Sequence, residues 1–213
     1  PGTGDTLQTA NMTYQEKQRL FRGLSQVDTD ILLLDVGAGT SYHVLDFFMH
    51  SDLQICATMP EPTAIMDFYN FLQLATIRKA LSGFLSSGQV SSSLKKHNFS
   101  SLAEVFALAE ETQEGSRELA QQALKYFHPL LITNKVGNNA KLNKLKLQKM
   151  TSKYLGINLP DLGEVPDDPM VLESTKTFLP VCEYAPESPA TKALTDIAIK
   201  LNKVVDLFVS KQQ

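Results

Sequence analysis

The sequence predicts an α/β fold in which a mainly parallel sheet is flanked by helices. Apolar runs of strand length alternate along the chain with longer segments of helical periodicity, which is the pattern of strand–helix–strand units. The run ILLL at residues 31–34 has no polar residue between its members, as expected for a strand that is buried on both faces of a parallel sheet. The 213 residues are enough for one such domain with a substantial hydrophobic core.

Turn and capping signals divide the N-terminal half into short elements. Thr13 followed by Glu16 is a capping box, so a helix is expected to begin at residue 14. Pro60 ends a short apolar run, and Pro62 suits the first turn of the helix that follows. The expected elements are, in order, a loop at 1–13, a helix at 14–27, a strand at 31–34, a helix at 42–49, a strand at 54–58 and a long helix at 62–85.

The C-terminal half continues the alternation. The Gly/Ser-rich piece that includes residues 86–100 is expected to be a flexible linker. The last helix is amphipathic, because its apolar residues recur at helical spacing. The remaining expected elements are a helix at 102–127, a strand at 129–136, a lysine-rich helix at 139–154, a short strand at 162–165 and a final helix from residue 189.

Composition and charge argue against several classes of protein. The net charge of -3 gives no strong signal for nucleic acid. Cys56 and Cys182 are far apart and fit no CxxC spacing, which argues against a zinc site, an iron–sulfur cluster or a disulfide scaffold. This cysteine usage favours a reducing compartment, and no apolar run approaches the roughly 18 residues of a membrane span. We therefore expect a cytoplasmic protein.

The stretch DVGAGTS, which follows the first expected strand, is the main candidate for a ligand-binding site. Ligands of open α/β sheets bind at the carboxyl ends of the strands, and Asp35 stands at such an end. Gly37 and Gly39 have no Cβ, so the backbone there can adopt unusual dihedral angles and approach a ligand closely. Two kinds of ligand fit this arrangement, a nucleoside triphosphate with its magnesium ion and S-adenosylmethionine.

For S-adenosylmethionine, the stretch resembles the first motif of Rossmann-type methyltransferases, in which an acid is followed by three alternate glycines. That resemblance implies that Glu61, after the expected strand at 54–58, holds the ribose hydroxyls. Ser41, however, stands where the third glycine belongs, and the later catalytic motifs of that family are missing. The methyltransferase is therefore the less favoured alternative.

Four stretches together resemble the MinD/ParA-type P-loop ATPases. ILLLDVGAG is similar to the Walker B strand and switch of that family, and ICATMPEPTAIMDFYNFL is similar to its next strand and helix. LLITNKV is similar to the strand whose final asparagine binds adenine, and the segment from LGEVPDDP onwards is similar to the closing elements. The resemblance covers residues 14–209 and is closest to the FlhG/FleN-like flagellar-number regulators.

The resemblance implies ATP and Mg²⁺ as cofactors and a hydrolase in which two subunits close around two nucleotides. Dimerisation would then act as a nucleotide-dependent switch in cellular positioning or flagellar number control, with a protein partner from such a system. Contact with a membrane surface is not favoured, because the apolar face of the last helix is also what packing on the sheet requires. The implied site residues are Asp35 for catalysis and the metal ion, Gly37 and Gly39 for the γ-phosphate, and Asn134, Pro166 and Asp168 for the adenine.

Each of these residues also has a purely structural interpretation. Asp35 could cap the glycine turn, and Asn134 could satisfy local backbone groups, as loop asparagines commonly do. Pro166 and Asp168 could form only a turn. The sequence leaves these alternatives open.

The lysine-bearing phosphate loop of the family has no counterpart in these residues, because no GKGGxGKT-like stretch is present. Either the chain is the C-terminal two-thirds of a complete ATPase, or it is a P-loop-less regulatory interaction module. In both cases we expect this chain alone to hydrolyse ATP no faster than background. Without a P-loop strand beside it, the strand expected at 31–34 would lose a hydrogen-bonded neighbour or pair directly with the strand at 54–58.

Overall fold

The computed structural model describes residues 12–84, 94, 97, 99–137 and 142–210. The chain divides into two compact units, residues 1–52 and 53–213, and each is described by itself. Residues 1–11 of the expected N-terminal loop and most of the expected linker at 86–100 lie outside the described residues.

The first unit contains two helices, α1 (Tyr14–Leu24) and α2 (Tyr42–His50). The expected capping box is present, since Thr13 Oγ1 accepts the Glu16 N–H at 3.3 Å and the Glu16 carboxylate accepts the Thr13 N–H at 2.8 Å. The ring of Phe21 stacks on His50 with the centroids 3.8 Å apart. This contact and an ion pair between Lys17 and Asp46 join α1 to α2.

The strand expected at residues 31–34 is not formed, and that prediction is wrong for this structure. The segment has neither helical nor strand geometry, and the side chains of Ile31, Leu32 and Leu33 are 47%, 44% and 77% exposed. A strand requires a neighbour that satisfies its backbone N–H and C=O groups. The described sheet consists of three other strands. Residues 31–34 therefore have the apolar composition of a buried strand, but no strand of the described sheet pairs with them.

The second unit is built on a parallel sheet with the order β1 (Ile55–Thr58), β2 (Leu130–Val136), β3 (Asp161–Pro166). These strands lie within one or two residues of the positions that the sequence predicts. Register pairs Thr58 with Thr133 across β1 and β2, and Val136 with Pro166 across β2 and β3. The fold is therefore mixed α/β with a small parallel sheet, and β1 is one of its edges.

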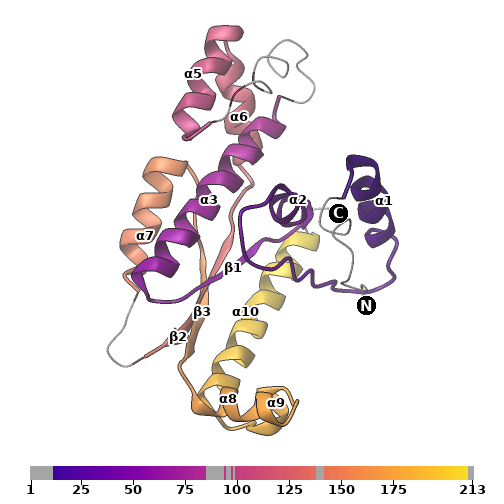
Figure 1. Ribbon diagram of the computed structural model, residues 1–213, viewed down its shortest axis with the longest axis vertical. Helices are drawn as coiled ribbons and strands as arrows, with labels where there is room; N and C mark the ends of the chain where they lie inside the picture. The colour runs from indigo at the N-terminus through magenta and orange to yellow at the C-terminus, as the bar shows by residue number, and fades with distance from the viewer. Residues whose placement is uncertain (1–11, 85–93, 95–96, 98, 138–141, 211–213) are drawn as a thin grey trace. The chain divides into compact units, whose positions relative to one another are not determined.

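Helices cover both faces of this sheet (Figure 1). On one side lies α3 (Pro62–Ser82), with Pro62 in its first turn as expected, and on the other lies α10 (Pro189–Ser210). Further helical elements of the described residues are α5 (Leu102–Thr112), α6 (Ser116–Leu124), α7 (Lys144–Met150), a π-helical turn η2 (Thr151–Leu155), α8 (Pro169–Lys176) and α9 (Val181–Tyr184).

Two expected helices differ from the structure. The helix expected at 102–127 is divided into α5 and α6, because Gly115 adopts a left-handed φ of 80° that an α-helix cannot contain. The lysine-rich helix begins only at Lys144 and ends in η2, where Gly156 has a φ of 65°. Gly115 is the N-cap of α6, after α5 has ended at Thr112, whereas Gly156 is the C-cap of η2.

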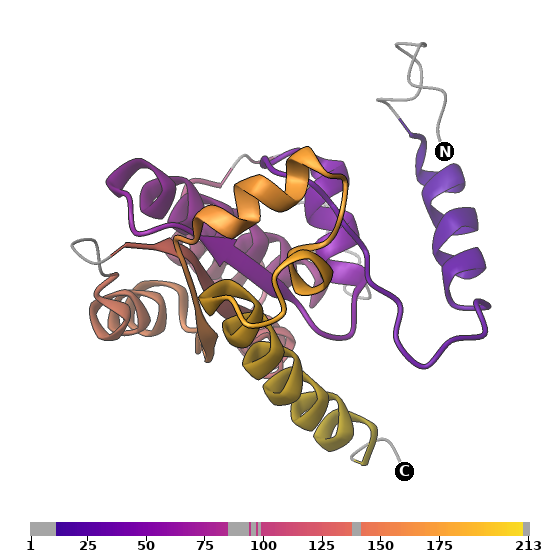
Figure 2. The same cartoon turned by 90° about the horizontal axis from the view of Figure 1, so that it is seen from below.

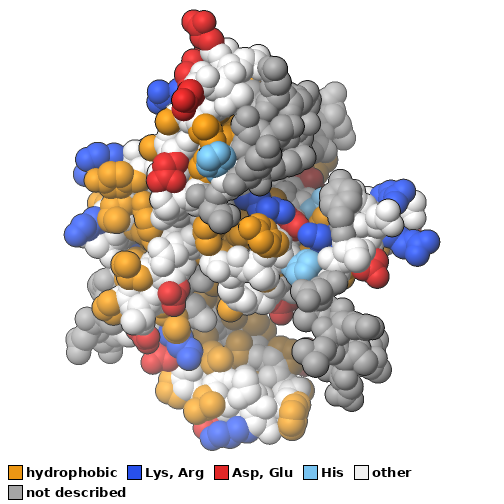
Figure 3. Space-filling view, turned by 45° about the horizontal axis from the view of Figure 1, so that its top comes forward, with side chains coloured by type: hydrophobic (Ala, Val, Ile, Leu, Met, Phe, Trp, Pro, Cys, Tyr) orange, Lys and Arg blue, Asp and Glu red, His pale blue; other side chains and the backbone are white. Residues whose placement is uncertain are grey.

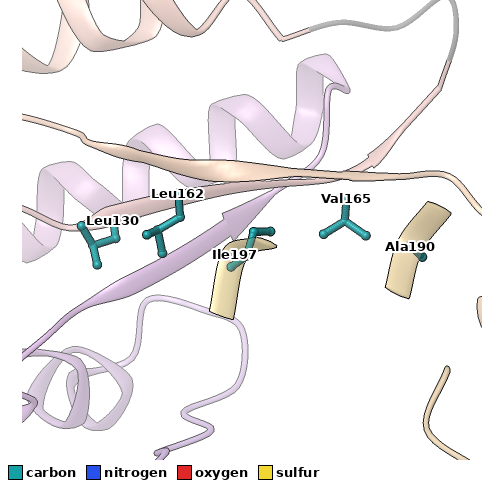
Figure 4. Packing of buried hydrophobic residues seen from close by; sticks show 5 residues of the cluster. All are labelled: Leu130, Leu162, Val165, Ala190 and Ile197. Carbon is teal, nitrogen blue, oxygen red and sulfur yellow. The ribbon is translucent and has the colours of Figure 1, made fainter. Parts of the chain in front are cut away.

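The core beneath the sheet is formed by β2, β3 and α10 (Figure 4). Leu130, Leu162 and Val165 of the strands pack with Ala190 and Ile197 of the helix. Each fully buried aliphatic side chain contributes about 1.5–3 kcal/mol through removal of apolar surface from water. The last turns of α10 extend past the sheet (Figure 2).

None of the helices in the described part of the chain is long and apolar enough to cross a membrane.

Candidate nucleotide site

The predicted nucleotide-site residues fall into two groups, one in each unit. Asp35, Gly37 and Gly39 lie in the first unit, on the segment that leads into α2. Asn134, Pro166 and Asp168 lie in the second unit, at the carboxyl ends of β2 and β3. The structure brings together the residues of each group.

The glycine turn of the first unit has the backbone geometry that requires glycine. Gly37 has a φ of 68° and Gly39 a φ of 114°, both in a region that residues with a Cβ rarely adopt. A Cβ at either position would meet no atom within 4 Å, so the requirement is conformational and the space beside the backbone is open. The Asp35 Oδ1 atom accepts the Gly37 N–H at 3.3 Å.

Helix α2 begins directly after this turn, and Ser41 is its N-cap. Its Oγ accepts the Val44 N–H at 3.3 Å and caps the N-terminus of α2. The residue that departs from the methyltransferase motif therefore has a local structural role.

The second group lies at the carboxyl edge of the sheet, where ligands of open parallel sheets bind. Asn134 is exposed near the end of β2, and Pro166 is half-buried at the end of β3. The two strand ends are tied together, because the Asp167 N–H donates to the Val136 carbonyl at 3.1 Å. Parallel pairing thus brings Asn134, Pro166 and Asp168 to one edge, as expected for residues that share a ligand.

Asn134 is followed by a strained residue. Lys135 has a φ of 52°, which is uncommon for a residue with a side chain, and its N–H donates to Asn134 Oδ1 at 2.9 Å. The local backbone contact foreseen for Asn134 is therefore present. No hydrogen bond from its Nδ2 group to another described residue is observed.

Asp168 is held by two backbone groups. One carboxylate oxygen accepts the Met170 N–H at 2.9 Å and caps α8, and the other accepts the Ala190 N–H at 3.0 Å at the start of α10. The hydrogen bond from Ala190 and then that from Met170 hold the pKa of Asp168 below its ordinary value, although burial acts in the opposite direction. The structural role that the sequence left open for Asp168 is thus observed, and adenine contact through this carboxylate stays a prediction.

Thr133 was not foreseen by the sequence. It is fully buried in the middle of β2, and its Oγ1 has no hydrogen-bond partner in the part of the chain that the structure describes. Its register neighbour Thr58 differs, since Thr58 Oγ1 donates to the Ala64 carbonyl at 3.2 Å. A buried hydroxyl without a partner is uncommon, and no sequence signal distinguishes it from an ordinary strand threonine.

The lysine-rich helix α7 contacts strand β3 through its first residue, Lys144. Lys144 Nζ contacts Asp161 at 2.6 Å and Glu164 at 2.9 Å. Burial acts to lower the pKa of Lys144, but the hydrogen bonds to these two carboxylates outweigh it and raise the pKa overall. Figure 3 shows lysine or arginine side chains beside an exposed apolar cluster at the left edge of the molecule, on the side where Figure 1 draws α7.

The first group fits a magnesium ion bound to nucleotide phosphates in part. Magnesium in phosphoryl-transfer sites is bound by one or two carboxylates together with substrate phosphates and water, and Asp35 offers one exposed carboxylate. Among the described residues no three His, Cys, Asp or Glu side chains are grouped to hold a metal ion by themselves. Any magnesium here would therefore depend on the phosphates for most of its ligands.

Comparisons with known proteins add no family: no family model matches the chain, and no curated protein matches it.

Proposed function

We propose that the chain is the ATP-binding domain of a MinD/ParA-like switch ATPase that acts in the cytoplasm. In this proposal the nucleotide controls dimerisation for cellular positioning or flagellar number control, and Mg²⁺ accompanies ATP. Asp35 binds the metal ion, Gly37 and Gly39 receive the γ-phosphate, and Asn134 with Pro166 receives the adenine.

The observation that carries the proposal is the meeting of Asn134, Pro166 and Asp168 at the carboxyl edge of a parallel sheet. Each belongs to a stretch that resembles the adenine-binding elements of the MinD/ParA-type ATPases. The amide of Asn134 offers donors to a ring nitrogen, and the backbone beyond Pro166 offers further polar groups. Asp168 caps α8 at the same edge, and its contact with the adenine is part of this proposal.

The glycine turn adds independent support. A triphosphate needs backbone N–H groups that approach without side-chain interference, and the positive φ angles of Gly37 and Gly39 are typical of such turns. The nearby carboxylate of Asp35 offers oxygen atoms, which are the ligands that magnesium prefers.

Binding tests the proposal directly. The ¹⁵N-labelled chain is titrated with Mg–ATP, and backbone amide shifts are followed by NMR. We expect saturable shifts at Gly37, Gly39 and Asn134, with weak affinity because no P-loop lysine neutralises the phosphates. Asp35→Asn and Asn134→Ala are each expected to weaken binding at least tenfold.

Two control variants match these changes. Asp30→Asn removes an exposed carboxylate five residues before Asp35, and Asn202→Ala removes an exposed amide on α10. Both are expected to bind Mg–ATP as the unchanged chain does. Absence of saturable Mg–ATP binding, or equal losses in the controls, would contradict the proposal.

Hydrolysis and an alternative cofactor give two further readouts. The chain alone is expected to hydrolyse ATP no faster than background, and turnover that depends on Asp35 would show that a missing P-loop lysine is not limiting. Protection from thermal unfolding by S-adenosylmethionine, without protection by Mg–ATP, would favour the methyltransferase instead.

A further inference from the structure

A second site candidate lies in the second unit, away from the sheet edge, between α5, α6 and the turn that follows η2. The groove there encloses about 540 Å³, within the range of roughly 300–1,000 Å³ that is usual for small-molecule sites. Its apolar wall is formed by the buried Leu102 and Leu124 and the half-buried Phe106. We call it the basic groove, and the side chains used below are Phe106, Arg117, Lys125, His128, Lys153 and Tyr154.

The charge of the groove is of one sign. Arg117 comes from α6, Lys125 from its C-terminal cap and Lys153 from η2, and His128 lies between α6 and β2. No aspartate or glutamate is among the residues that line the groove, although the whole chain has a net charge of -3. Elements that are far apart in the sequence therefore bring cations together against the overall balance of charge.

These cations contact aromatic rings. Arg117, Lys125 and Lys153 form no ion pair with a carboxylate among the described residues. A ring face orients a cation without neutralising it, so the charge stays available to an anion. The distances to the ring centroids are 5.2 Å for Arg117 over Phe106, 5.0 Å for Lys153 over Tyr154 and 5.5 Å for Lys125 over Tyr126.

The acidic residue Glu110 lies near Arg117, and its carboxylate is hydrogen-bonded to backbone groups. The Glu110 carboxylate accepts the N–H groups of Gly115 at 2.9 Å and Arg117 at 3.0 Å. These hydrogen bonds, first that from Gly115, lower the pKa of Glu110, and the charge of Arg117 adds to the effect. The carboxylate thus closes the turn between α5 and α6 and is not among the groove residues.

We propose that the basic groove binds a small molecule that carries phosphate groups. A guanidinium matches phosphate with two parallel hydrogen bonds, and the ammonium groups of Lys125 and Lys153 supply compact charges from the end of α6 and from η2. The wall of Leu102, Leu124 and Phe106 gives an organic part of the ligand an apolar surface. The site shares no residue with the proposed nucleotide site and does not depend on it.

The test uses inorganic pyrophosphate as the first probe, with the whole ¹⁵N-labelled chain. We expect saturable amide shifts around Arg117, Lys125, His128 and Gly156. ADP and adenosine are titrated separately to distinguish the source of the phosphate. Tighter binding of ADP than of pyrophosphate assigns a phosphorylated organic ligand, and equal binding assigns the inorganic anion, with adenosine alone giving no shifts in either case.

Charge-matched variants separate a specific site from general attraction. Arg117→Gln with Lys153→Gln is expected to weaken pyrophosphate binding at least tenfold. Lys176→Gln with Lys203→Gln removes the same charge from exposed positions on α8 and α10 and is expected to change it less than twofold. Pyrophosphate binding is also measured for Lys125→Gln, which removes one groove charge and keeps the contacts of Arg117 with Phe106 and of Lys153 with Tyr154.

Two results would overturn the inference. One is the lack of saturable binding of pyrophosphate and ADP at millimolar concentration, and the other is an equal loss in the groove and control pairs. Circular dichroism and thermal unfolding establish that each variant is folded. Shifts that occur only at Gly37, Gly39 and Asn134 would refute the groove and leave the proposed nucleotide site supported, so the two proposals fail separately.

Discussion

The Asp168 carboxylate accepts the backbone N–H of Ala190, 22 residues further along the chain, at 3.0 Å. Its other oxygen accepts the Met170 N–H at 2.9 Å. One side chain therefore satisfies the N-terminal backbone groups of both α8 and α10. Because Ala190 belongs to the core beneath the sheet, this carboxylate also fixes where the last helix begins to pack.

Replacement of Asp168 by Asn is expected to destabilise the fold in a pH-dependent way. The pKa of Asp168 is lowered in the folded state, so its stabilising contribution is present above the unfolded pKa of about 3.9 and is lost as pH falls through the folded value. The Tm difference between Asp168→Asn and the unchanged chain should therefore be largest near pH 7 and shrink below pH of about 4. Thermal unfolding followed by circular dichroism over this pH range measures it.

The control for this change is Asp167→Asn, which alters the neighbouring exposed carboxyl group. It is expected to leave Tm nearly unchanged. A Tm loss in Asp168→Asn that is the same at every pH, or a matching loss in the control, would show that the two hydrogen bonds to the ionised carboxylate are not the cause.

Thr133→Val is expected to stabilise the protein. The Thr133 hydroxyl is buried without a partner among the described residues, and its removal relieves a desolvation cost of about 1 kcal/mol. For a chain of this size that corresponds to a rise in Tm of roughly 2–4 °C. Thr76→Val is the matched control, because Thr76 is equally buried but donates to the Leu72 carbonyl at 2.7 Å. The control should be neutral or destabilised, and a Tm rise of the same size in both variants would refute the explanation.

Gly163→Ala is expected to destabilise the contact between β3 and α10. Gly163 has a φ of 156°, and a Cβ there would lie 2.8 Å from Ile197 Cγ1. Overpacking of this kind costs about 1–3 kcal/mol, which chemical denaturation measures. Gly137→Ala serves as the control, since a Cβ at Gly137 would meet no atom of the described residues within 4 Å. If both alanine variants are as stable as the unchanged chain, the close approach of the helix to the strand does not limit stability.

The two cysteines are expected to differ in reactivity. Cys56 is buried in β1, and burial raises the pKa of its thiol to about 12, so it is protonated and inaccessible at neutral pH. Cys182 is exposed on α9. A thiol reagent should therefore label one cysteine in the folded chain and both in guanidinium, and Cys182→Ser should abolish labelling of the folded form. Rapid labelling of Cys56 without denaturant would show that β1 opens readily.

Local signals in the sequence predicted much of the second unit. The apolar runs at β1, β2 and β3, the capping box at Thr13 and the first-turn proline at Pro62 all depend on residues a few positions apart. For the same reason the positive φ angles of Gly37 and Gly39 were foreseeable from residue type. Such features are decided by backbone dihedral preferences and by short-range hydrogen bonds.

The break between α5 and α6 was missed because a glycine inside a helical pattern is compatible with both a helix and a turn. The turn is stabilised by the Glu110 carboxylate, which accepts the N–H groups of Gly115 and Arg117, and by the backbone hydrogen bond from Ser116 to Gln113. Similarly, Thr133 looked like any strand threonine, because the lack of a hydrogen-bond partner depends on the residues packed around it.

By itself the sequence determined the α/β class and the positions of the three parallel strands. The tertiary structure alone decided that ILLL at 31–34 forms no strand, that Asp168 joins α8 to α10, and that cations of α6 and η2 share one groove. The reason is physical. Strand formation, carboxylate capping over 22 residues and convergence of charge each require a partner from a distant part of the chain, and a sequence pattern describes only one of the two partners.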